Sequence, residues 1–397
     1  MDDLILIEEP TDITLEDVFR AYYQCRKNKR NKVDCLEFDL EYEVHLIKLW
    51  EEIKRGDYAI SPLFVFIVDK PVKREIFASS FRDRIVHHLI VMKLELLFEK
   101  EFIYDTYSCR VGKGTHFGIN RIERFIRKCS NNDKDECYVL KLDIKGYFMS
   151  INKTLLLKKI ESFINKKYFY FDKDKLQWLC QKVILNDATK DCLKKASSDR
   201  WKGLPKPKSL FYAKENCGMP IGNYTNQVFA NFYLNNFDHF IKSELGIKYY
   251  GRYVDDFVLL SSDKIELIEV IPKIRRYLKE KLDLDLHPKK IYLQKAEYGV
   301  EFLGVYIKPW RKYITPRIKN NLYLLIKEIK ICLLKKKLLK KEKQKIRARL
   351  NSYFGILSHS NTYNLKEKII NMLNADFWNY FIYVNCYFKL KNTRQKH

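Results

Sequence analysis

The sequence predicts a globular α+β protein. Hydrophobic residues make up 46% of the 397 residues and aromatic residues 14%, which is enough for a core in two or three packed subdomains. Short runs rich in Val, Phe, Tyr and Leu, which favour strands, alternate with longer segments whose apolar residues recur at helical spacing. One pair of such runs, at 249–260, encloses two adjacent carboxylates, Asp255 and Asp256. Together these observations indicate strands that present an acidic pair, covered by helices.

The elements of the first half follow from this spacing. In chain order we expect helices within 14–55, a strand pair with a basic tip over 62–78 that turns at Lys70-Pro71, a helix over 82–101, a strand over 138–144, and a helix over 153–165 capped by Asn152. The stretch 186–216 is polar and interrupted by Gly and Pro. It therefore predicts an exposed loop.

The second half continues the alternation and then becomes helical. We expect a helix over 223–242, a hairpin over 248–261, an amphipathic helix over 265–281, and strands at 291–295 and 301–307. From 316 to 385 the spacing predicts helices only, with a Lys-dense one at 325–349. No internal repeat or low-complexity linker separates these parts.

The charge of the chain indicates a polyanionic partner. The formal net charge is +25, and residues 311–397 alone contain 21 Lys and Arg against 4 Asp and Glu. Nucleic acid offers phosphates in a row, and neutralising them releases condensed counterions. An anionic membrane surface is the competing partner, but the sequence has no apolar run of about eighteen residues.

Several further features favour residence in the cytoplasm. Met1-Asp2-Asp3 does not begin a signal-peptide pattern, and we find no lipidation motif. The ten cysteines form no Cys-x-x-Cys pair and no zinc-like cluster with the eight histidines. We therefore expect reduced thiols and no membrane partner.

The acidic pair indicates a metal site. A charged pair between two strands is best placed at a hairpin tip, where both carboxylates escape burial and face the same small volume. Two divalent ions roughly 3.5–4 Å apart can stabilise the attacking and leaving oxygens of a phosphoryl displacement, provided that another carboxylate joins them. The alternative for Asp255-Asp256 alone is an acidic surface turn, which is common.

A third carboxylate stands at the end of the apolar strand expected before residue 144. Asp143 follows Val139-Leu140-Lys141-Leu142 and precedes a helix. A carboxylate in a buried strand is costly unless it binds a cation or a hydrogen-bond donor, so a metal ligand is favoured. The alternative is an Asp that caps the helix.

These motifs, in this order, resemble those of the reverse transcriptases, which are RNA-directed DNA polymerases with a right-hand fold. The resemblance covers roughly residues 60–360. It implies that Asp143, Asp255 and Asp256 are catalytic and hold two Mg²⁺ ions, or Mn²⁺, with the backbone carbonyl of Ile144. The resemblance also implies an RNA template, a DNA or RNA primer and deoxynucleoside triphosphates as partners.

The same resemblance implies a nucleotide site and a primer site. The nucleotide-binding residues are Lys73, Arg74, Phe148, Ile221, Gly222, Gln227 and Lys290. Phe148 would act as a steric gate against a ribose 2′-hydroxyl, for which core packing is the alternative. Lys290 would meet the triphosphate or protonate pyrophosphate. The residues implied at the primer or template are Tyr253, Phe302, Leu303 and Gly304.

Two arginines at the start of the helix expected over 82–101 have two open interpretations. Arg82 and Arg84 suit contacts with template or triphosphate, because a guanidinium matches phosphate oxygens. Structural salt bridges explain them equally well.

The segment Gly218-Met219-Pro220-Ile221-Gly222 departs from most of the family, which carries Gln-Gly here. It resembles the reverse transcriptases of diversity-generating retroelements and related phage-defence enzymes, although Asn226 replaces their usual Ser. An apolar Ile221 beside the nascent base pair cannot donate the hydrogen bonds of a Gln amide. We therefore expect low copying fidelity, which the subgroup resemblance also implies.

The domain organisation follows the right-hand fold that the resemblance implies. We expect an N-terminal helical extension (1–60), fingers (61–137), palm (138–222, with the loop 186–216 inserted, and 223–310, with the catalytic hairpin and primer grip), and a basic helical thumb with a C-terminal tail (311–397). The expected function is cDNA synthesis in a diversity-generating retroelement, with a small basic accessory protein. The alternatives are phage defence with a structured noncoding RNA, and a maturase-like RNA-binding protein without catalysis.

Overall fold

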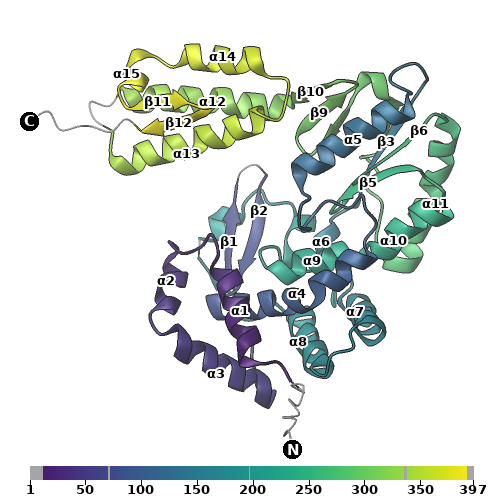
Figure 1. Cartoon of the computed structure of the whole chain (residues 1–397), viewed down its shortest axis with the longest axis vertical. Coiled ribbons are helices and arrows are strands. Elements are labelled where there is room, and N and C mark those ends of the chain that lie inside the picture. Colours follow the sequence, from purple (N-terminus) through teal and green to yellow (C-terminus); the bar gives the residue numbers. More distant parts are fainter. Residues whose placement is uncertain (1–11, 70–71, 196, 335–337, 391–397) are drawn as a thin grey trace, which may run out of the picture.

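A four-stranded antiparallel sheet carries the acidic pair (Figure 1). The computed structural model describes residues 12–69, 72–195, 197–334 and 338–390. The strand order is β5-β6-β3-β7, and the strands are β3 (Tyr138–Asp143), β5 (Tyr249–Tyr253), β6 (Asp256–Ser261) and β7 (Tyr292–Lys295). The expected strand at 138–144 and hairpin at 248–261 are confirmed.

Both faces of this sheet are covered, because successive side chains of a strand point to opposite faces. Leu140, Leu142 and Leu259 pack into the main core with the helices of one face. Val139 and Leu260 pack on the other face against α5 (Thr115–Cys129). The main core also includes residues of α4 (Phe81–Glu101), α7 (Lys153–Lys167), α8 (Lys173–Leu185), α9 (Tyr224–Tyr233) and α11 (Lys264–Leu282).

The helix expected over 223–242 is interrupted, and this prediction is wrong in its continuity. After α9, a short α10 (Asn235–His239) and a π-helical turn (Phe240–Glu244) follow. The helix is interrupted at Leu234, and α10 after the break carries Asp238, which pairs with Arg252 of β5. The helices expected over 82–101, 153–165 and 265–281 are confirmed, and Asn152 caps the second of them through the backbone N–H of Leu155.

A second, three-stranded sheet lies beside the N-terminal helices. The hairpin of β1 (Phe64–Val68) and β2 (Arg74–Ala78) is joined by the parallel β4 (Leu193–Lys194). The expected turn at Lys70-Pro71 lies outside the described residues. The N-terminal helices are α1 (Leu15–Arg26), α2 (Val33–Asp39) and α3 (Tyr42–Arg55), as the spacing of 14–55 predicts.

The expectation of an exposed loop over 186–216 is correct only in part. Besides β4 it contains short 3₁₀ turns (Ser198–Trp201, Lys206–Lys208 and Leu210–Tyr212). Ser209 and Leu210 are buried. The reason is the buried carboxylate of Glu75 on β2, which binds donors of this loop.

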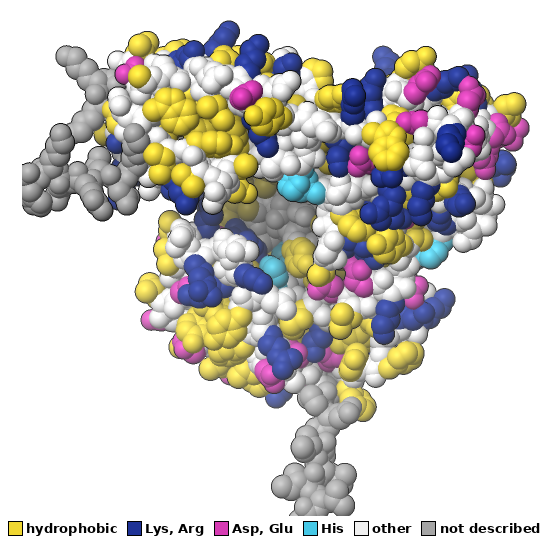
Figure 2. Space-filling view, turned by 45° about the horizontal axis from the view of Figure 1, so that its top comes forward, with side chains coloured by type: hydrophobic (Ala, Val, Ile, Leu, Met, Phe, Trp, Pro, Cys, Tyr) yellow, Lys and Arg dark blue, Asp and Glu magenta, His cyan; other side chains and the backbone are white. Residues whose placement is uncertain are grey.

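The C-terminal lobe has a core of its own. The helices α12 (Pro316–Leu333), α13 (Lys340–Leu357), α14 (Tyr363–Met372) and α15 (Ala375–Trp378) pack with the hairpin of β11 (Phe381–Val384) and β12 (Tyr387–Leu390). A small sheet, β10-β9-β8, precedes them, with β8 (Val300–Phe302), β9 (Val305–Lys308) and β10 (Arg311–Ile314). Figure 2 shows a hollow between this lobe and the rest of the molecule, with Lys and Arg side chains near its rim.

Two predictions for this lobe are wrong. The stretch 316–385 is not helical throughout, because Asn385 and Cys386 both have positive φ (50° and 66°) and close a two-residue hairpin turn. The Lys-dense stretch 325–349 belongs to two helices, α12 and α13, rather than one. Across the described residues we find no helix with the length and apolar character that crossing a bilayer requires.

Candidate active site

Asp143 and Asp256 lie directly opposite each other on neighbouring strands. The carbonyl of Asp143 accepts a hydrogen bond from the backbone N–H of His287 (2.8 Å), on the side away from β6. The pair with Asp256 is therefore of the non-hydrogen-bonded type, in which opposing Cα atoms are only about 4.5 Å apart and the side chains are close. The structure thus brings together carboxylates that are far apart in the sequence.

Asp255 lies at the tip of the β5–β6 hairpin. The two-residue turn consists of Val254 and Asp255, between the paired residues Tyr253 and Asp256. Val254 has a φ of +58°, which is rare for a β-branched residue and costs on the order of 1–3 kcal/mol. Asp256 itself starts β6 and is mostly buried, with 22% of its side chain exposed, so the expectation that both carboxylates escape burial is wrong.

The strained turn is held by Arg252, a fully buried residue of β5. Its Nη1 donates to the carbonyl of Val254 (2.8 Å) and to Asn231 Oδ1 (3.0 Å). Its Nε and Nη2 donate to the two carboxylate oxygens of Asp238 (2.7 and 2.5 Å), and the hydroxyl of Tyr250 donates to the same carboxylate (2.6 Å). Our sequence analysis missed Arg252, although an arginine within an apolar strand is a signal that a buried partner exists.

The pKa values of the acidic pair are raised. Burial, and then the charge of Asp143, raise the pKa of Asp255 to about 6. Burial raises the pKa of Asp256 to about 7, and the ammonium of Lys141 opposes this rise. The ionised forms of Asp255 and Asp256 are therefore disfavoured in the metal-free protein, and a bound cation would stabilise them.

Two lysines contact this acidic cluster. Lys290 Nζ lies 2.8 Å from Asp143 Oδ2, and Lys141 Nζ lies 3.2 Å from Asp256 Oδ2. Lys141 also donates to the backbone carbonyl of Glu301 in β8 (2.8 Å). Lys290 was expected at a triphosphate, and the structure places it on a carboxylate of the acidic cluster.

The residues present fit hard divalent cations. Carboxylate and carbonyl oxygens are the ligands that Mg²⁺ and Mn²⁺ prefer. Asp256 Oδ1 is buried and has no hydrogen-bond partner among the described residues. The bridge between Ile144 and Leu286 uses the backbone of the residues flanking Ile144, so the Ile144 carbonyl is directed to the opposite side, toward β6.

The carboxylates are nevertheless held by lysines rather than arranged around a single point. Among the residues that the structure describes, no three Asp, Glu, His or Cys side chains already form a group that could hold a metal ion. Binding a cation would therefore require Lys290 and Lys141 to release Asp143 and Asp256. The metal role of these residues stays a prediction.

Two of the predicted nucleotide residues, Ile221 and Gly222, lie against β2. The backbone N–H of Phe77 donates to the carbonyl of Ile221 (2.8 Å). Gly222 has a φ of +134°, and a Cβ there would lie 2.6 Å from the Phe77 carbonyl oxygen, so only glycine fits this contact. Arg74, two residues before Ile76 on the same strand, is near enough to Asp255 to lower its pKa.

The other nucleotide residues have mixed surroundings. Lys73 Nζ donates to the carbonyl of Lys202 (2.5 Å). Phe148 is half-buried and packs against the same small cluster as Ile221, so packing accounts for part of its role. Gln227 is exposed on α9, where its Oε1 accepts from the thiol of Cys109 (3.5 Å).

The predicted primer residues form a second hairpin next to the sheet. Phe302 of β8 pairs with Val305 of β9, and Leu303 and Gly304 form the turn with positive φ (51° and 82°). Phe302 is fully buried in the cluster against which Tyr253 and Leu303 pack. The two hairpins are thus joined through one apolar core.

For the arginines with two interpretations, the structure favours salt bridges. Arg82 pairs with Glu52 and with Asp83 (3.3 Å). Arg84 pairs with Asp34 (2.7 Å). These contacts tie α4 to the N-terminal helices.

Glu75, on β2, is a further residue whose position sequence reasoning missed. Its carboxylate is 1% exposed and accepts from Trp201 Nε1 (2.6 Å), Ser209 Oγ (3.1 Å) and the backbone N–H of Leu210 (2.7 Å). A buried carboxylate is tolerated only with such donors. It fastens the loop 198–212 to the strand that carries Arg74.

Asp143 and Asp256, side by side at the edge of a covered sheet next to the hairpin tip with Asp255, suit the phosphoryl chemistry of the nucleotidyltransferase class. Residues 70–307, more than half of the chain, match the family model described as reverse transcriptase (RNA-dependent DNA polymerase). The chain belongs to the reverse transcriptase family. The family and the α+β right-hand polymerase fold that we expected are confirmed, whereas the narrower subgroup stays a prediction.

Curated relatives show how distant the similarity is. Protein YkfC of Escherichia coli is 23% identical over 303 residues, which is 68% of this chain and 72% of the relative. The putative COX1/OXI3 intron 2 protein of Saccharomyces cerevisiae is 21% identical over 70% of this chain and 36% of its own length. An uncharacterized 91 kDa protein in the cob intron of Schizosaccharomyces pombe is 23% identical over 51% of this chain and 22% of its own length.

Solved telomerase structures are also similar. For telomerase from Candida albicans with a fragment of telomeric RNA, the TM-score is 0.47 at 12% identity, over 85% of this chain and 59% of that one. For apo telomerase from Candida tropicalis, truncated from its C-terminal domain, the TM-score is 0.45 at 17% identity, over 68% of this chain and 60% of that one. The chain thus spans about three fifths of these telomerase chains.

Asp255→Asn should stabilise the metal-free protein at high pH. The folded pKa of Asp255, about 6, exceeds the ordinary value, so ionisation destabilises the fold above pH 6 and has no effect below about pH 4. We expect the variant to be more stable by about 1–3 kcal/mol at pH 8 in EDTA, with the difference vanishing near pH 4. Urea unfolding at both pH values measures this, with the exposed Asp191→Asn as control. Equal stability of Asp255→Asn and wild type at pH 8 would contradict the prediction.

Arg252→Lys should impair positioning of the hairpin tip more than folding. Lysine keeps a charge for Asp238 but loses the fork that also holds the Val254 carbonyl. We expect kcat for nucleotide addition to fall at least about tenfold, and the Mg²⁺ concentration for half-maximal rate to rise. Arg110, whose side chain is also buried and which pairs with Glu99 (2.8 Å), provides the matched control Arg110→Lys. The control should keep the wild-type dependence of rate on Mg²⁺ concentration. If Arg252→Lys keeps it too, the proposed positioning role of Arg252 is wrong.

Proposed function

We propose that this protein copies an RNA template into DNA by two-metal nucleotidyl transfer at Asp143, Asp255 and Asp256. The observation that carries the proposal is the strand register that sets Asp143 opposite Asp256, directly beside the tip that presents Asp255. Bound Mg²⁺ would lower the pKa of a primer 3′-hydroxyl and neutralise charge on departing pyrophosphate. Mn²⁺ suits the same oxygen ligands.

The chain's own cations would bind the incoming nucleotide. Arg74 offers a guanidinium fork on the strand that faces the acidic cluster, and Lys73 precedes it. Lys290 is 56% exposed beside Asp143, within reach of phosphates held at that carboxylate. Phe148 and Ile221, which share one apolar cluster, would form the wall against the sugar and base. Gly222 lets the backbone approach closely, and Gln227 would lie further along the same segment.

The primer and template would occupy the hollow between the C-terminal lobe and the rest of the molecule (Figure 2). Tyr253 lies next to the catalytic tip, and the Leu303-Gly304 turn belongs to the hairpin that shares its core. We assign residues 61–137 to fingers, 138–310 to palm and 311–397 to thumb. The basic C-terminal lobe would contact the phosphate backbone.

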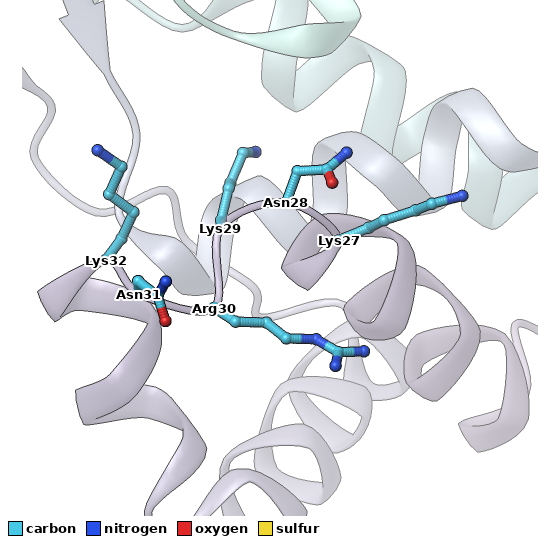
Figure 3. Close-up of a pocket in the computed structure, with 6 residues that line it drawn as sticks. All are labelled: Lys27, Asn28, Lys29, Arg30, Asn31 and Lys32. Atoms are coloured by element: carbon cyan, nitrogen blue, oxygen red, sulfur yellow. The ribbon is translucent and has the colours of Figure 1, made fainter. Parts of the chain in front are cut away.

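A basic loop between α1 and α2 adds to the polyanion surface (Figure 3). Residues 27–32 surround a hollow of about 390 Å³, and four of these six side chains are Lys or Arg. Burial and the charge of Lys29 lower the pKa of His88 to about 4, and the His88 ring lies 4.9 Å from that of Tyr224 on α9. Four cationic side chains around one hollow suit the phosphates of RNA.

For the biological role we propose cDNA synthesis of low fidelity in a diversity-generating retroelement in the cytoplasm, with a small basic accessory protein. The support is the segment Gly218-Met219-Pro220-Ile221-Gly222, in which Ile221 stands where most of the family carries Gln. Phage defence with a structured noncoding RNA shares that support. A maturase-like role is the second candidate, and the similarity to two proteins encoded in introns favours it.

Primer extension tests the proposed chemistry directly. Purified protein with Mg²⁺ and an RNA template annealed to a DNA primer should incorporate deoxynucleotides. Replacing both hairpin carboxylates (Asp255→Ala with Asp256→Ala) should abolish incorporation, because the metal ligands are lost. Asp191→Asn serves as the control. Extension that survives the double substitution would refute the assignment, and a wild type that binds RNA without extending any primer would favour the maturase-like role.

Ile221→Gln tests the fidelity proposal. The Ile221 carbonyl, not its side chain, accepts from Phe77, so the substitution keeps this backbone contact. A Gln amide adds hydrogen bonds worth on the order of 1 kcal/mol, so misincorporation should fall roughly two- to tenfold. Sequencing of products copied from a defined RNA template, with Ile221→Val as control, gives the error rates. An unchanged error spectrum would count against the role of Ile221.

A further inference from the structure

Three consecutive aromatic side chains are exposed at the turn between α7 and α8. The exposed fractions of Phe169, Tyr170 and Phe171 are 85%, 67% and 62%. We call residues 169–171 the aromatic turn. Contiguous exposed apolar surface of this kind marks interaction sites.

The aromatic turn is held in place by buried polar contacts on both sides. Tyr168 is 2% exposed, and its hydroxyl donates to Asp172 Oδ1 (2.8 Å). Asp172 is 4% exposed, and its other oxygen lies 3.0 Å from Lys93 Nζ of α4. The backbone N–H of Leu176 donates to the Asp172 carbonyl (2.9 Å). Because both flanks are fixed, the three rings are kept outward.

Lysines surround the aromatic turn. Lys166 and Lys167 precede it, and Lys173 follows it. A hollow of about 390 Å³ beside the rings is lined by Leu97, Lys100, Glu101, Lys167, Phe169 and Tyr170. Glu101 is neutralised by Lys167 (2.8 Å), and the carboxylate of Asp172 is paired inside the protein. The exposed Asp174 offsets one lysine, and Lys100, Lys166 and Lys173 together still leave the surface around the rings with excess positive charge.

This combination suits single-stranded nucleic acid. Exposed rings stack on bases that are not paired, and neighbouring lysines contact the phosphates. A duplex would hide its bases from the rings. Figure 1 shows α7 and α8 at the end of the body away from the C-terminal lobe, so this surface is separate from the hollow next to that lobe in Figure 2.

We propose that the aromatic turn, with Lys166 and Lys173, binds a single-stranded segment of RNA outside the stretch being copied. This inference rests on the proposed use of an RNA template. Its role is to retain the RNA molecule during synthesis while the template moves through the active site. Charge complementarity suits both RNA and an acidic protein, and the exposed rings favour RNA because unpaired bases stack on them.

The test compares RNA affinity and polymerase activity in the full-length protein. One variant replaces the aromatic turn (Phe169→Ala, Tyr170→Ala and Phe171→Ala together), and a matched control replaces exposed aromatic residues elsewhere (Tyr104→Ala with Tyr298→Ala). Fluorescence anisotropy with a labelled, unstructured RNA of twenty nucleotides should show at least a tenfold weaker Kd for the first variant only. Affinity for duplex RNA should be unchanged.

A charge variant tests the phosphate contacts separately. Lys166→Gln with Lys173→Gln should reduce the slope of log affinity against log salt by about 1.4, because each phosphate contact of a single strand contributes about 0.7. Extension of a short primer–template without flanking RNA should stay at the wild-type rate in all variants, so that loss of this activity reports on the proposed function instead. If the aromatic variant binds the single-stranded RNA as tightly as wild type, the inference is overturned. This holds even if that variant loses self-association or binding to another protein, because the aromatic turn would then be a protein contact.

Discussion

The register between β3 and β6 is the constraint on which the candidate site depends. A shift of one residue would move Asp143 to the opposite face of the sheet and leave Asp256 without its neighbour. The apolar residues of β3 and β6 prevent this shift, since Leu140 and Leu142 face one core and Val139 faces another. The same packing that stabilises the sheet therefore holds two negative charges side by side.

Holding those charges is costly, and the surrounding cations offset the cost. Lys290 and Lys141 contact the two opposing carboxylates, and Arg252 supports the turn from the other face of the sheet. Burying the ion pair of Arg252 and Asp238 gives little net stability, because the desolvation of both groups opposes their attraction. Its effect is to fix the backbone of Val254 in a conformation that this residue would otherwise avoid.

Much of the fold could be predicted because apolar spacing is a local signal. The hairpin around Asp255, the strand before Asp143 and the cap at Asn152 all follow from neighbouring residues. The break after Leu234 could not be predicted, because it depends on a partner, Arg252, that comes later in the chain. Likewise, Asn385 and Cys386 turn the last hairpin within a stretch whose spacing suited a helix. The order of the motifs along the sequence predicts the three acidic residues of the candidate site. The contacts of Lys290 and Lys141 with them could not be predicted, because they depend on the folded arrangement of the strands.

The contacts that fix β2 limit how far the proposed nucleotide site can move when a substrate binds. β2, which bears Arg74, is held against the segment of Ile221 and Gly222 by the Phe77–Ile221 hydrogen bond and the close contact at Gly222. The buried Glu75 also ties β2 to the loop at Leu210. An enzyme that tests each substrate by a closing motion needs these parts to separate and return. Here these contacts join β2 to the segment of Ile221 and Gly222 beforehand, so a closing motion between them has little scope at the proposed nucleotide site.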